Sequence, residues 1–119
     1  MAIGFMWGID FMTERESRIY NLYCAKLHTA YMYEANFLEE AKEFIALFEK
    51  CVLIRAEITT RNGVADLLIC YRGRFIGAEL KRLYGKPSMQ QLKFVQDVNE
   101  AGGRAAVCKT LKELWDLMV

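Results

Sequence analysis

The spacing of apolar residues changes along the chain, and each change marks a different kind of predicted element. Over residues 14–49, apolar side chains recur at intervals of three and four, which is typical of an amphipathic helix. Thr13-Glu-Arg-Glu16 supplies a capping box for the start of that helix. Neither Gly nor Pro occurs between Gly8 and Gly63, so the pattern predicts one long helix or two stacked ones.

Beyond residue 50 the apolar residues form short runs, many of them β-branched, and this pattern predicts β-strands. Four such runs are present: 51–58, 66–71, 74–81 and 105–108. Arg72-Gly73 joins the second run to the third and is typical of a tight hairpin turn. These two runs are therefore expected to pair as antiparallel neighbours.

Two capping residues predict the remaining helices. Ser88 is expected to start a helix that ends near Gly102-Gly103, and Thr110 starts a last amphipathic helix. The order of elements is then helix, three strands, helix, strand, helix, which predicts an α/β fold in which helices sandwich a mixed central sheet. A chain of 119 residues makes one ordinary domain, residues 1–119, with residues 1–33 as an N-terminal helical extension.

Two carboxylates and a lysine converge at one edge of the predicted sheet. If the hairpin strands pair antiparallel, the start of one lies beside the end of the other, so Asp66 approaches Glu79. Side chains alternate along a strand, so Glu79 and Lys81 share a face and Leu80 turns away. Carboxylate oxygens suit a hard cation such as Mg²⁺ or Mn²⁺, and a lysine beside the ion can hold a water next to a phosphate.

In their order along the chain, four motifs resemble the virus-type replication-repair nuclease (VRR-NUC) domain of the PD-(D/E)XK superfamily. The motifs are Gly63-Val-Ala-Asp66, Phe75-Ile-Gly-Ala-Glu79-Leu-Lys81, Gly85-Lys-Pro-Ser88-Met-Gln-Gln91 and Ala101-Gly-Gly103. The resemblance covers about residues 34–119, which would form the nuclease core. Ala65 stands where the superfamily name puts proline, which loses a rigid turn but no ligand.

The resemblance implies a restriction-endonuclease-like fold and a metal-dependent, structure-selective endonuclease that hydrolyses DNA phosphodiester bonds. Asp66 and Glu79 would bind Mg²⁺ or Mn²⁺, assisted by the backbone carbonyl of Leu80. Lys81 would orient the attacking water or neutralise developing charge, and Gln91 would support the site from the start of a helix. The preferred DNA would be branched or a four-way junction, cut by a homodimer with one site for each of two strands.

A carboxylate on the first helix is a further expected member of the site. Glu34 fills a gap in the apolar stripe, and the pattern Glu-x-x-apolar of the family is matched by Glu34-Ala-Asn-Phe37. A buried carboxylate is costly unless it binds a cation or a partner, and the resemblance implies that this glutamate faces the metal site. Glu40, at the edge of the stripe, ranks second, whereas Glu39 lies nearly opposite the stripe. That Glu34 is a partly exposed boundary residue stays an equal alternative. Gln90 is the near alternative to Gln91.

The overall net charge of +1 is low for a nucleic-acid-binding protein, but the charge is unevenly distributed. Residues 1–50 hold five basic and eight acidic residues, whereas residues 51–119 hold 11 basic and seven acidic ones. The basic residues that flank the strands in sequence are candidates for phosphate contacts. They are Arg55, Arg61, Arg72, Arg74, Arg82, Lys86 and Lys93. Of these, Arg61, Arg82 and Lys86 are the preferred candidates, although a solvated surface charge is the simpler interpretation of any single one.

Composition excludes several other classes of site. Because His28 is the only histidine, zinc clusters built on histidines and Ser-His-Asp triads are excluded. The four cysteines lack Cys-x-x-Cys spacing and are interpreted as reduced core residues. The apolar segment Ile3–Met12 is interrupted by Asp10 and is too short to cross a membrane, so a cytoplasmic protein is expected. That segment is instead expected to build the dimer. The resemblance further implies a phage- or bacterium-like protein.

The aromatic residues, including Trp7, Trp115 and six tyrosines, are interpreted as core or interface residues rather than as base-stacking platforms. Two further hypotheses stay open. The chain could be a catalytically silent nucleic-acid-binding relative, or an interaction module in which Glu79 and Lys81 form a surface ion pair on an edge strand.

Overall fold

The computed structural model describes residues 12–57 and 61–119, and it contains four helices and four strands within them. In chain order these are α1 Glu14–Tyr23, α2 Glu34–Ile45, β1 Cys51–Arg55, β2 Leu67–Tyr71, β3 Arg74–Leu80, α3 Met89–Glu100, β4 Arg104–Cys108 and α4 Leu111–Met118. Residues 3–11 of the apolar N-terminal segment, which is predicted to build the dimer, lie outside the described residues.

The sheet has the order β1-β2-β3-β4 and is mixed. Strands β1, β2 and β3 form an antiparallel meander, whereas β3 and β4 are parallel and are connected through α3. The β2–β3 turn has positive φ at both central residues, 55° at Arg72 and 75° at Gly73, as a two-residue hairpin turn of type I′ requires. The predicted hairpin is therefore confirmed.

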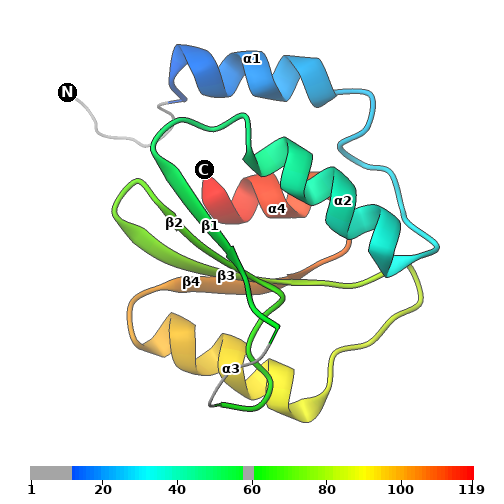
Figure 1. Cartoon of the computed structure of the whole chain (residues 1–119), viewed down its shortest axis with the longest axis vertical. Helices are drawn as coiled ribbons and strands as arrows, with labels where there is room; N and C mark the ends of the chain where they lie inside the picture. The colour runs from blue at the N-terminus through cyan, green and yellow to red at the C-terminus, as the bar shows by residue number, and fades with distance from the viewer. Residues whose placement is uncertain (1–11, 58–60) are drawn as a thin grey trace.

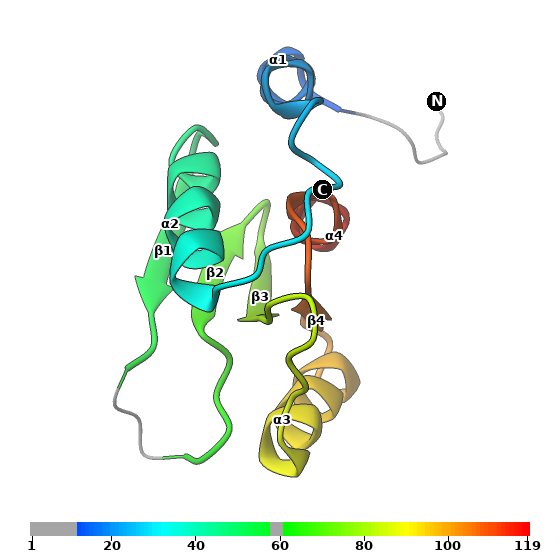
Figure 2. The same cartoon turned by 90° about the vertical axis from the view of Figure 1, so that its right-hand side faces the viewer.

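The helices cover both faces of the sheet, which confirms the predicted α/β sandwich (Figures 1 and 2). Helices α1, α2 and α4 lie on one face, and α3 lies on the other. The larger core fills the first face, with side chains such as Phe37, Phe44 and Leu114 fully buried. A smaller core of Ala65, Phe94, Val98 and Ala105 fixes α3 to the second face.

The apolar stripe over residues 14–49 belongs to two helices rather than to one long helix, and both alternatives were predicted. The chain leaves the helix after Tyr23 and re-enters one at Glu34. Leu27 lies in the turn between them, yet it is only 1% exposed and its carbonyl accepts a hydrogen bond from the N–H of Lys112 at 2.9 Å. The break is thus stabilised by contact with α4, far away in sequence.

The predicted helix caps are confirmed, and the strand limits need small corrections. Thr13, Ser88 and Thr110 all accept hydrogen bonds as N-cap residues, the first two within complete capping boxes. Strand β1 ends at Arg55 rather than continuing to residue 58, which lies outside the described residues. Strand β2 begins one residue later than expected, and β3 ends one residue earlier.

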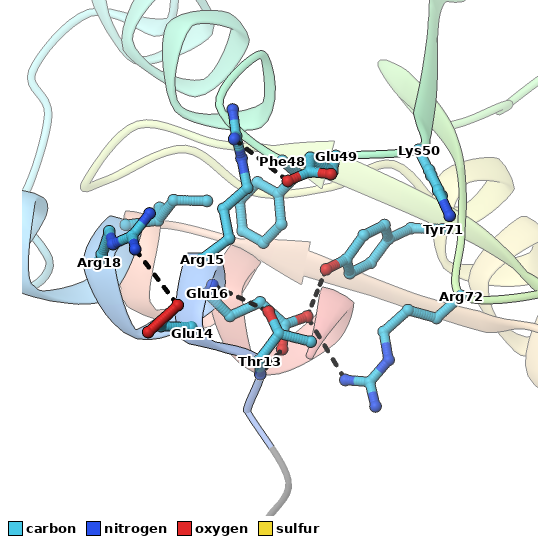
Figure 3. Close-up of a pocket in the computed structure, with 11 residues that line it drawn as sticks. Thr13, Glu14, Arg15, Glu16, Arg18, Phe48, Glu49, Lys50, Tyr71 and Arg72 are labelled. Carbon is cyan, nitrogen blue, oxygen red and sulfur yellow. Dashed lines mark hydrogen bonds and ion pairs between the residues drawn. The ribbon is translucent and has the colours of Figure 1, made fainter.

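Helix α1 is attached to the sheet by a buried glutamate (Figure 3). Glu16 is 1% exposed, and its Oε1 accepts a hydrogen bond from the N–H of Thr13 at 2.7 Å. Its Oε2 accepts the hydroxyl of Tyr71 and lies 3.4 Å from Nη1 of Arg72. Burial and the bond to Glu16 raise the pKa of Tyr71. These contacts tie α1 to the turn end of the β2–β3 hairpin.

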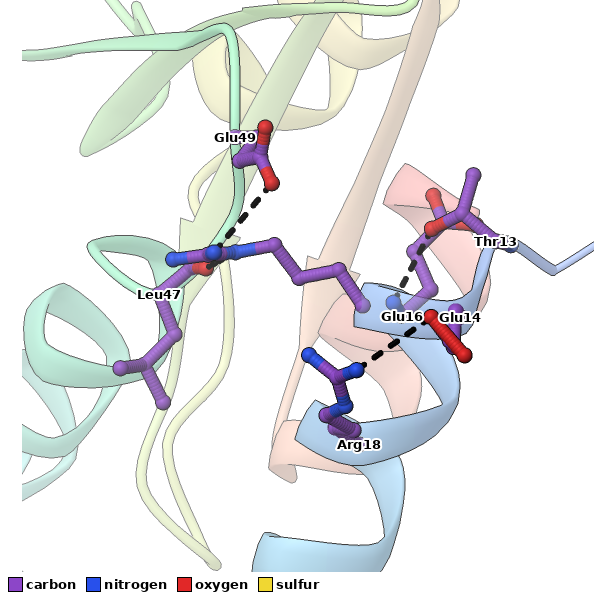
Figure 4. Close-up of polar contacts among 7 residues, drawn as sticks. Thr13, Glu14, Glu16, Arg18, Leu47 and Glu49 are labelled. Atoms are coloured by element: carbon purple, nitrogen blue, oxygen red, sulfur yellow. Dashed lines mark hydrogen bonds and ion pairs between the residues drawn. The ribbon is translucent and has the colours of Figure 1, made fainter.

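An arginine makes a second attachment between α1 and the end of α2 (Figure 4). Arg15 donates from Nε to the carbonyl of Leu47 at 2.8 Å, and its Nη1 lies 3.2 Å from Oε1 of Glu49. A cavity of about 480 Å³ lies beside these contacts, lined by residues of α1, by Phe48 and by Tyr71. The N-terminal helical extension is thus packed on the core at two points.

The cysteines are only partly core residues. All four thiols are free, and Cys108 is buried, but Cys24 and Cys70 are exposed, so the expectation that all four belong to the core is wrong. Cys70 faces solvent because α3 covers only the β3–β4 half of its face of the sheet, leaving Val52 and Phe75 exposed beside it in the register. Within residues 12–57 and 61–119, no helix is long and apolar enough to cross a membrane.

Candidate active site

Strands β2 and β3 bring Asp66 and Glu79 to the same edge of the sheet. Leu67 pairs with Ala78 in the antiparallel register. Asp66 directly precedes Leu67 and Glu79 directly follows Ala78, so the two carboxylates lie at the same edge. The carboxylate of Asp66 is held there, because its Oδ2 accepts a hydrogen bond from the N–H of Leu80 at 2.9 Å. This bond fixes Asp66 against the backbone segment that carries Glu79.

Glu79 is the buried carboxylate of the site, with 1% of its surface exposed. Its Oε2 accepts a hydrogen bond from Nε2 of Gln91 at 2.6 Å and lies 3.5 Å from Nζ of Lys81. Its Oε1 is also buried and has no hydrogen-bond partner within the described chain. Burial, followed by the negative charge of Asp66, raises the pKa of Glu79 to about 7, although Lys81 opposes the shift. A buried oxygen without a partner is costly, and a cation beside Asp66 would offset that cost.

Lys81 places a positive charge between two carboxylates. Its Nζ lies 3.5 Å from Oε2 of Glu79 and 3.8 Å from Oε2 of Glu34, and its side chain is 14% exposed. The N–H of Lys81 donates to the carbonyl of Cys108 at 2.9 Å, so the pairing of β3 with β4 reaches this residue. The ammonium group is therefore positioned by the sheet and keeps limited access to solvent.

The hypothesis of a surface ion pair on an edge strand is wrong. Strand β3 lies between β2 and β4, so the strand that carries Glu79 and leads into Lys81 is internal to the sheet. Glu79 is buried, and a charge in that environment is stable only with partners that offset its loss of hydration. The two residues belong to an enclosed cluster rather than to a solvated surface.

Gln91 uses both ends of its side-chain amide. It is the third residue of α3, and its Oε1 accepts the N–H of Ser88 at 2.8 Å to complete the capping box. Its Nε2 donates to Glu79. The sequence predicted Gln91 rather than Gln90 at this place, and Gln91 is the residue that reaches the site, whereas Gln90 is exposed.

Glu34 reaches the site from the first residue of α2, but it is not buried. Its side chain is 46% exposed, so the premise of a costly buried carboxylate in the apolar stripe is wrong. The premise failed because the stripe is interrupted just before Glu34. Of the three helix carboxylates considered, Glu34 contacts Lys81, whereas Glu40 pairs with Lys26 at 3.1 Å and Glu39 pairs with Lys42 at 3.0 Å.

A pocket of about 390 Å³ opens at this edge of the sheet. Its lining includes Glu34, Asp66 and Leu80, together with residues of α2 and Arg55. Arg55, a candidate for phosphate contacts that was not among the three preferred, pairs with Leu67 in the register and so lies next to Asp66. The strand pairing would have indicated this placement once the register was known.

A solved structure described as a VRR_NUC domain superposes on this chain with a TM-score of 0.59. The match has 24% sequence identity and covers 71% of this chain and 91% of that chain. No protein-family model and no curated protein sequence matches the chain. The chain has the VRR-NUC fold. The fold predicted from the motifs is therefore confirmed.

The donor set at the site of this VRR-NUC fold suits a hard divalent cation. Among the described residues, no group of three or more His, Cys, Asp and Glu side chains gathers as a ready-made metal site. The predicted donors, the carboxylates of Asp66 and Glu79 and the carbonyl of Leu80, would all be oxygen atoms. The unpartnered Oε1 of Glu79 fits such an ion, since Mg²⁺ and Mn²⁺ use few protein oxygens and keep several waters.

The three preferred basic residues differ in their surroundings. Arg61 forms an ion pair with Asp97 and lies with its guanidinium 5.5 Å from the centre of the Phe94 ring. Arg82 and Lys86 are exposed, and neither forms an ion pair with any residue of ranges 12–57 and 61–119. Arg82 and Lys86 are therefore the better placed for a phosphate, whereas Arg61 is engaged with α3.

Gly63 controls how the loop before Asp66 meets α3, a role that sequence analysis missed. Its φ is +78°, and a Cβ atom added there would lie 2.4 Å from the carbonyl carbon and oxygen of Gln90. Only glycine fits both this backbone conformation and this approach. The loop that leads to Asp66 and the helix start that carries Gln91 are thus in direct contact.

Proposed function

We propose that this chain is a metal-dependent endonuclease that hydrolyses phosphodiester bonds in DNA. The observation that carries the proposal is the cluster at the sheet edge, in which Asp66 and Glu79 lie together beside Lys81 and Glu79 keeps a buried oxygen without a partner. A structural ion pair would not require that unpartnered oxygen, whereas a cation site uses it. The likeness to a VRR_NUC domain supports the same chemistry.

Asp66, Glu79 and the carbonyl of Leu80 would hold Mg²⁺ or Mn²⁺. When bound, such an ion lowers the pKa of a water molecule and stabilises negative charge on phosphate oxygens. Lys81 neutralises charge that develops on the phosphate or orients the attacking water, because its ammonium is held within 3.8 Å of both flanking carboxylates. Gln91 would keep Glu79 in place through its hydrogen bond, and Glu34 would position Lys81 through their ion pair.

The proposal extends to the substrate and the assembly. The family resemblance favours branched or four-way junction DNA, in an intracellular setting such as DNA repair or phage replication. Arg82 and Lys86, with Arg61 near the Asp66 loop, would contact backbone phosphates. A homodimer would place one site on each of two strands. Light scattering on the full chain tests this assembly, and a monomer that still resolves four-way DNA would contradict it.

The decisive experiment is cleavage of a DNA panel by the purified full chain. Linear duplex, flap, splayed and four-way DNA are each incubated with Mg²⁺, with Mn²⁺ and with EDTA. Cleavage is expected only with a divalent cation. Lys81→Met keeps the aliphatic stem but removes the charge, and it is expected to lower the rate on the order of 10²-fold or more.

Lys112→Met is the matched control, since Lys112 pairs with Asp116 on the surface of α4. It should cleave as the unaltered chain does. Undiminished metal-dependent cleavage by Lys81→Met would remove the proposed site. Tight DNA binding by the unaltered chain without cleavage under any metal condition would instead identify a catalytically silent nucleic-acid-binding protein.

A further inference from the structure

Two of the six tyrosines are used differently from the others. Four of them pack their rings against core aromatics, with centroid distances of 5.1 Å from Tyr20 to Trp115, 4.9 Å from Tyr23 to Phe44, 4.6 Å from Tyr31 to Phe37 and 5.2 Å from Tyr71 to Phe48. Tyr33 and Tyr84 are 69% and 72% exposed. Neither has a ring partner or a side-chain hydrogen bond in the described part of the chain, so packing does not account for their presence.

Both exposed tyrosines lie beside site residues. Tyr33 is the N-cap residue of α2, directly before Glu34. Tyr84 follows Lys81 by three residues, in a turn closed by a hydrogen bond from the N–H of Gly85 to the carbonyl of Arg82 at 3.0 Å. Each ring is therefore carried by a segment that also carries a residue of the candidate active site.

A pair of hydrogen bonds joins the two segments. The N–H of Leu83 donates to the carbonyl of Tyr31 at 2.7 Å, and the carbonyl of Leu83 accepts from Nζ of Lys109 at 2.8 Å. The residue before Tyr84 is thus fixed to the residue two positions before Tyr33. In Figures 1 and 2 the segment before α2 and the segment after β3 meet at the same end of the sheet. The backbone segments that carry the two rings are therefore neighbours at one end of the sheet.

Two basic residues flank Tyr84 in the chain. Arg82 and Lys86 stand on either side of Tyr84, both exposed and without an ion pair in the described chain. Exposed rings near exposed cations suit single-stranded nucleic acid, because the rings can stack on bases while the cations contact phosphates. The bases of a continuous duplex are already stacked on one another, so they offer no free face to a ring.

We propose that Tyr33 and Tyr84 form a stacking rim that holds unpaired bases of the substrate next to the bond that is cut. The rim makes DNA with unpaired nucleotides at the cleavage point a better ligand than continuous duplex. This inference rests on the proposed nuclease function for the position of the bond, but it concerns binding and can be measured without cleavage.

The experiment measures binding of fluorescent oligonucleotides to the full chain in EDTA. The probes are single-stranded oligo(dT), the same strand with abasic positions, and a linear duplex. Tyr33→Ala and Tyr84→Ala should each weaken oligo(dT) binding on the order of tenfold, since stacking contributes about 1–3 kcal/mol per base. Tyr84→Phe should bind as the unaltered chain does, because the ring is kept. Leu22→Ala, which alters a residue 71% exposed on α1, is the matched control.

Abasic positions provide the sharpest test. They should weaken binding by the unaltered chain but have little further effect on the double variant Tyr33→Ala/Tyr84→Ala, which has lost both stacking partners. Three results would each overturn the inference. The alanine variants could lose as much affinity for duplex as for single-stranded DNA, Tyr84→Phe could bind as weakly as Tyr84→Ala, or the alanine variants could lose no affinity at all. Melting temperatures confirm that the variants fold. Tyrosine-dependent binding without any metal-dependent cleavage would contradict the nuclease function and leave the stacking rim intact.

Discussion

Gln91 hydrogen-bonds Glu79 across the gap between α3 and β3, with 2.6 Å between Nε2 and Oε2. The other end of the same amide closes the capping box of α3, where its Oε1 accepts the N–H of Ser88 at 2.8 Å. The start of the helix and the buried carboxylate are therefore linked by one side chain. A shift of the helix start would change the hydrogen bonding of Glu79.

Replacing Gln91 by alanine is expected to lower cleavage about tenfold and stability by about 1 kcal/mol, because both a capping bond and the bond to Glu79 are lost. Gln90→Ala is the matched control, since its side chain is exposed. Cleavage rates and denaturant midpoints on the same preparations check both values. Equal behaviour of the two variants would remove Gln91 from the site.

The stability of the metal-free protein should depend on pH through Glu79. Its pKa of about 7 lies above that of an ordinary glutamate, chiefly because of burial and then because of Asp66. The folded chain therefore holds this proton more tightly than the unfolded chain does. The stabilisation is complete at pH values below the ordinary glutamate pKa and is lost as the pH rises through about 7. In EDTA, the free energy of unfolding should fall by up to about 3 kcal/mol between about pH 5 and pH 8.

Glu79→Gln tests the assignment of this pH dependence. The amide cannot ionise, so the variant should lose most of the slope and should be more stable than the unaltered chain at the alkaline end. Glu100→Gln changes an exposed residue that contacts only Gln96 among the described residues, and it should keep the slope. Added Mn²⁺ should stabilise the unaltered chain most at alkaline pH. An unchanged slope in Glu79→Gln would assign the pH dependence to another group.

Calorimetric titration with Mn²⁺ should separate the two helix glutamates. Glu34→Gln keeps the size of the side chain but removes a charge next to Lys81, so it should weaken Mn²⁺ binding several-fold if Glu34 faces the ion. Glu40→Gln should leave Mn²⁺ binding unchanged and cost roughly 0.5 kcal/mol of stability, since its partner is Lys26. The reverse order would transfer the role to Glu40, and no effect in either would make Glu34 a surface residue.

The attachment of α1 should be measurable through Tyr71. Tyr71→Phe removes the hydroxyl that donates to buried Glu16, which should cost about 1–3 kcal/mol of stability. Tyr23→Phe is the control, because Tyr23 packs its ring on Phe44 and its hydroxyl has no hydrogen-bond partner in the described chain. Cleavage should be unchanged in both, since Tyr71 lies at the opposite end of β2 from Asp66. A loss of activity in Tyr71→Phe would show that α1 influences the site.

The central hairpin and its carboxylates could be predicted because the information is local. Arg72-Gly73 sets the turn, the turn sets the register, and the register places Asp66 beside Glu79. The same holds for Gln91, since a capping box places the third helical residue next to the N-cap residue. In each case, a few neighbouring residues determine the geometry.

The position of the helix break and the surroundings of Glu34 could not be predicted, because their causes are distant in sequence. Leu27 continues the apolar spacing although it lies in a turn, and the hydrogen bond that holds this turn comes from Lys112. The use of the tyrosines was likewise hidden, since residue type does not distinguish Tyr31, stacked on Phe37, from exposed Tyr33.

The contact between Gly63 and Gln90 determines which substitutions position 63 can tolerate. Any side chain at Gly63 would collide with the backbone of α3 and displace the loop before Asp66, the helix start that carries Gln91, or both. In a survey of random variants, this position would score as intolerant as a metal ligand although it offers no ligand atom. Loss of activity at Gly63 would therefore result from a displaced backbone near the site. A selection that scored activity alone would wrongly identify Gly63 as a catalytic residue.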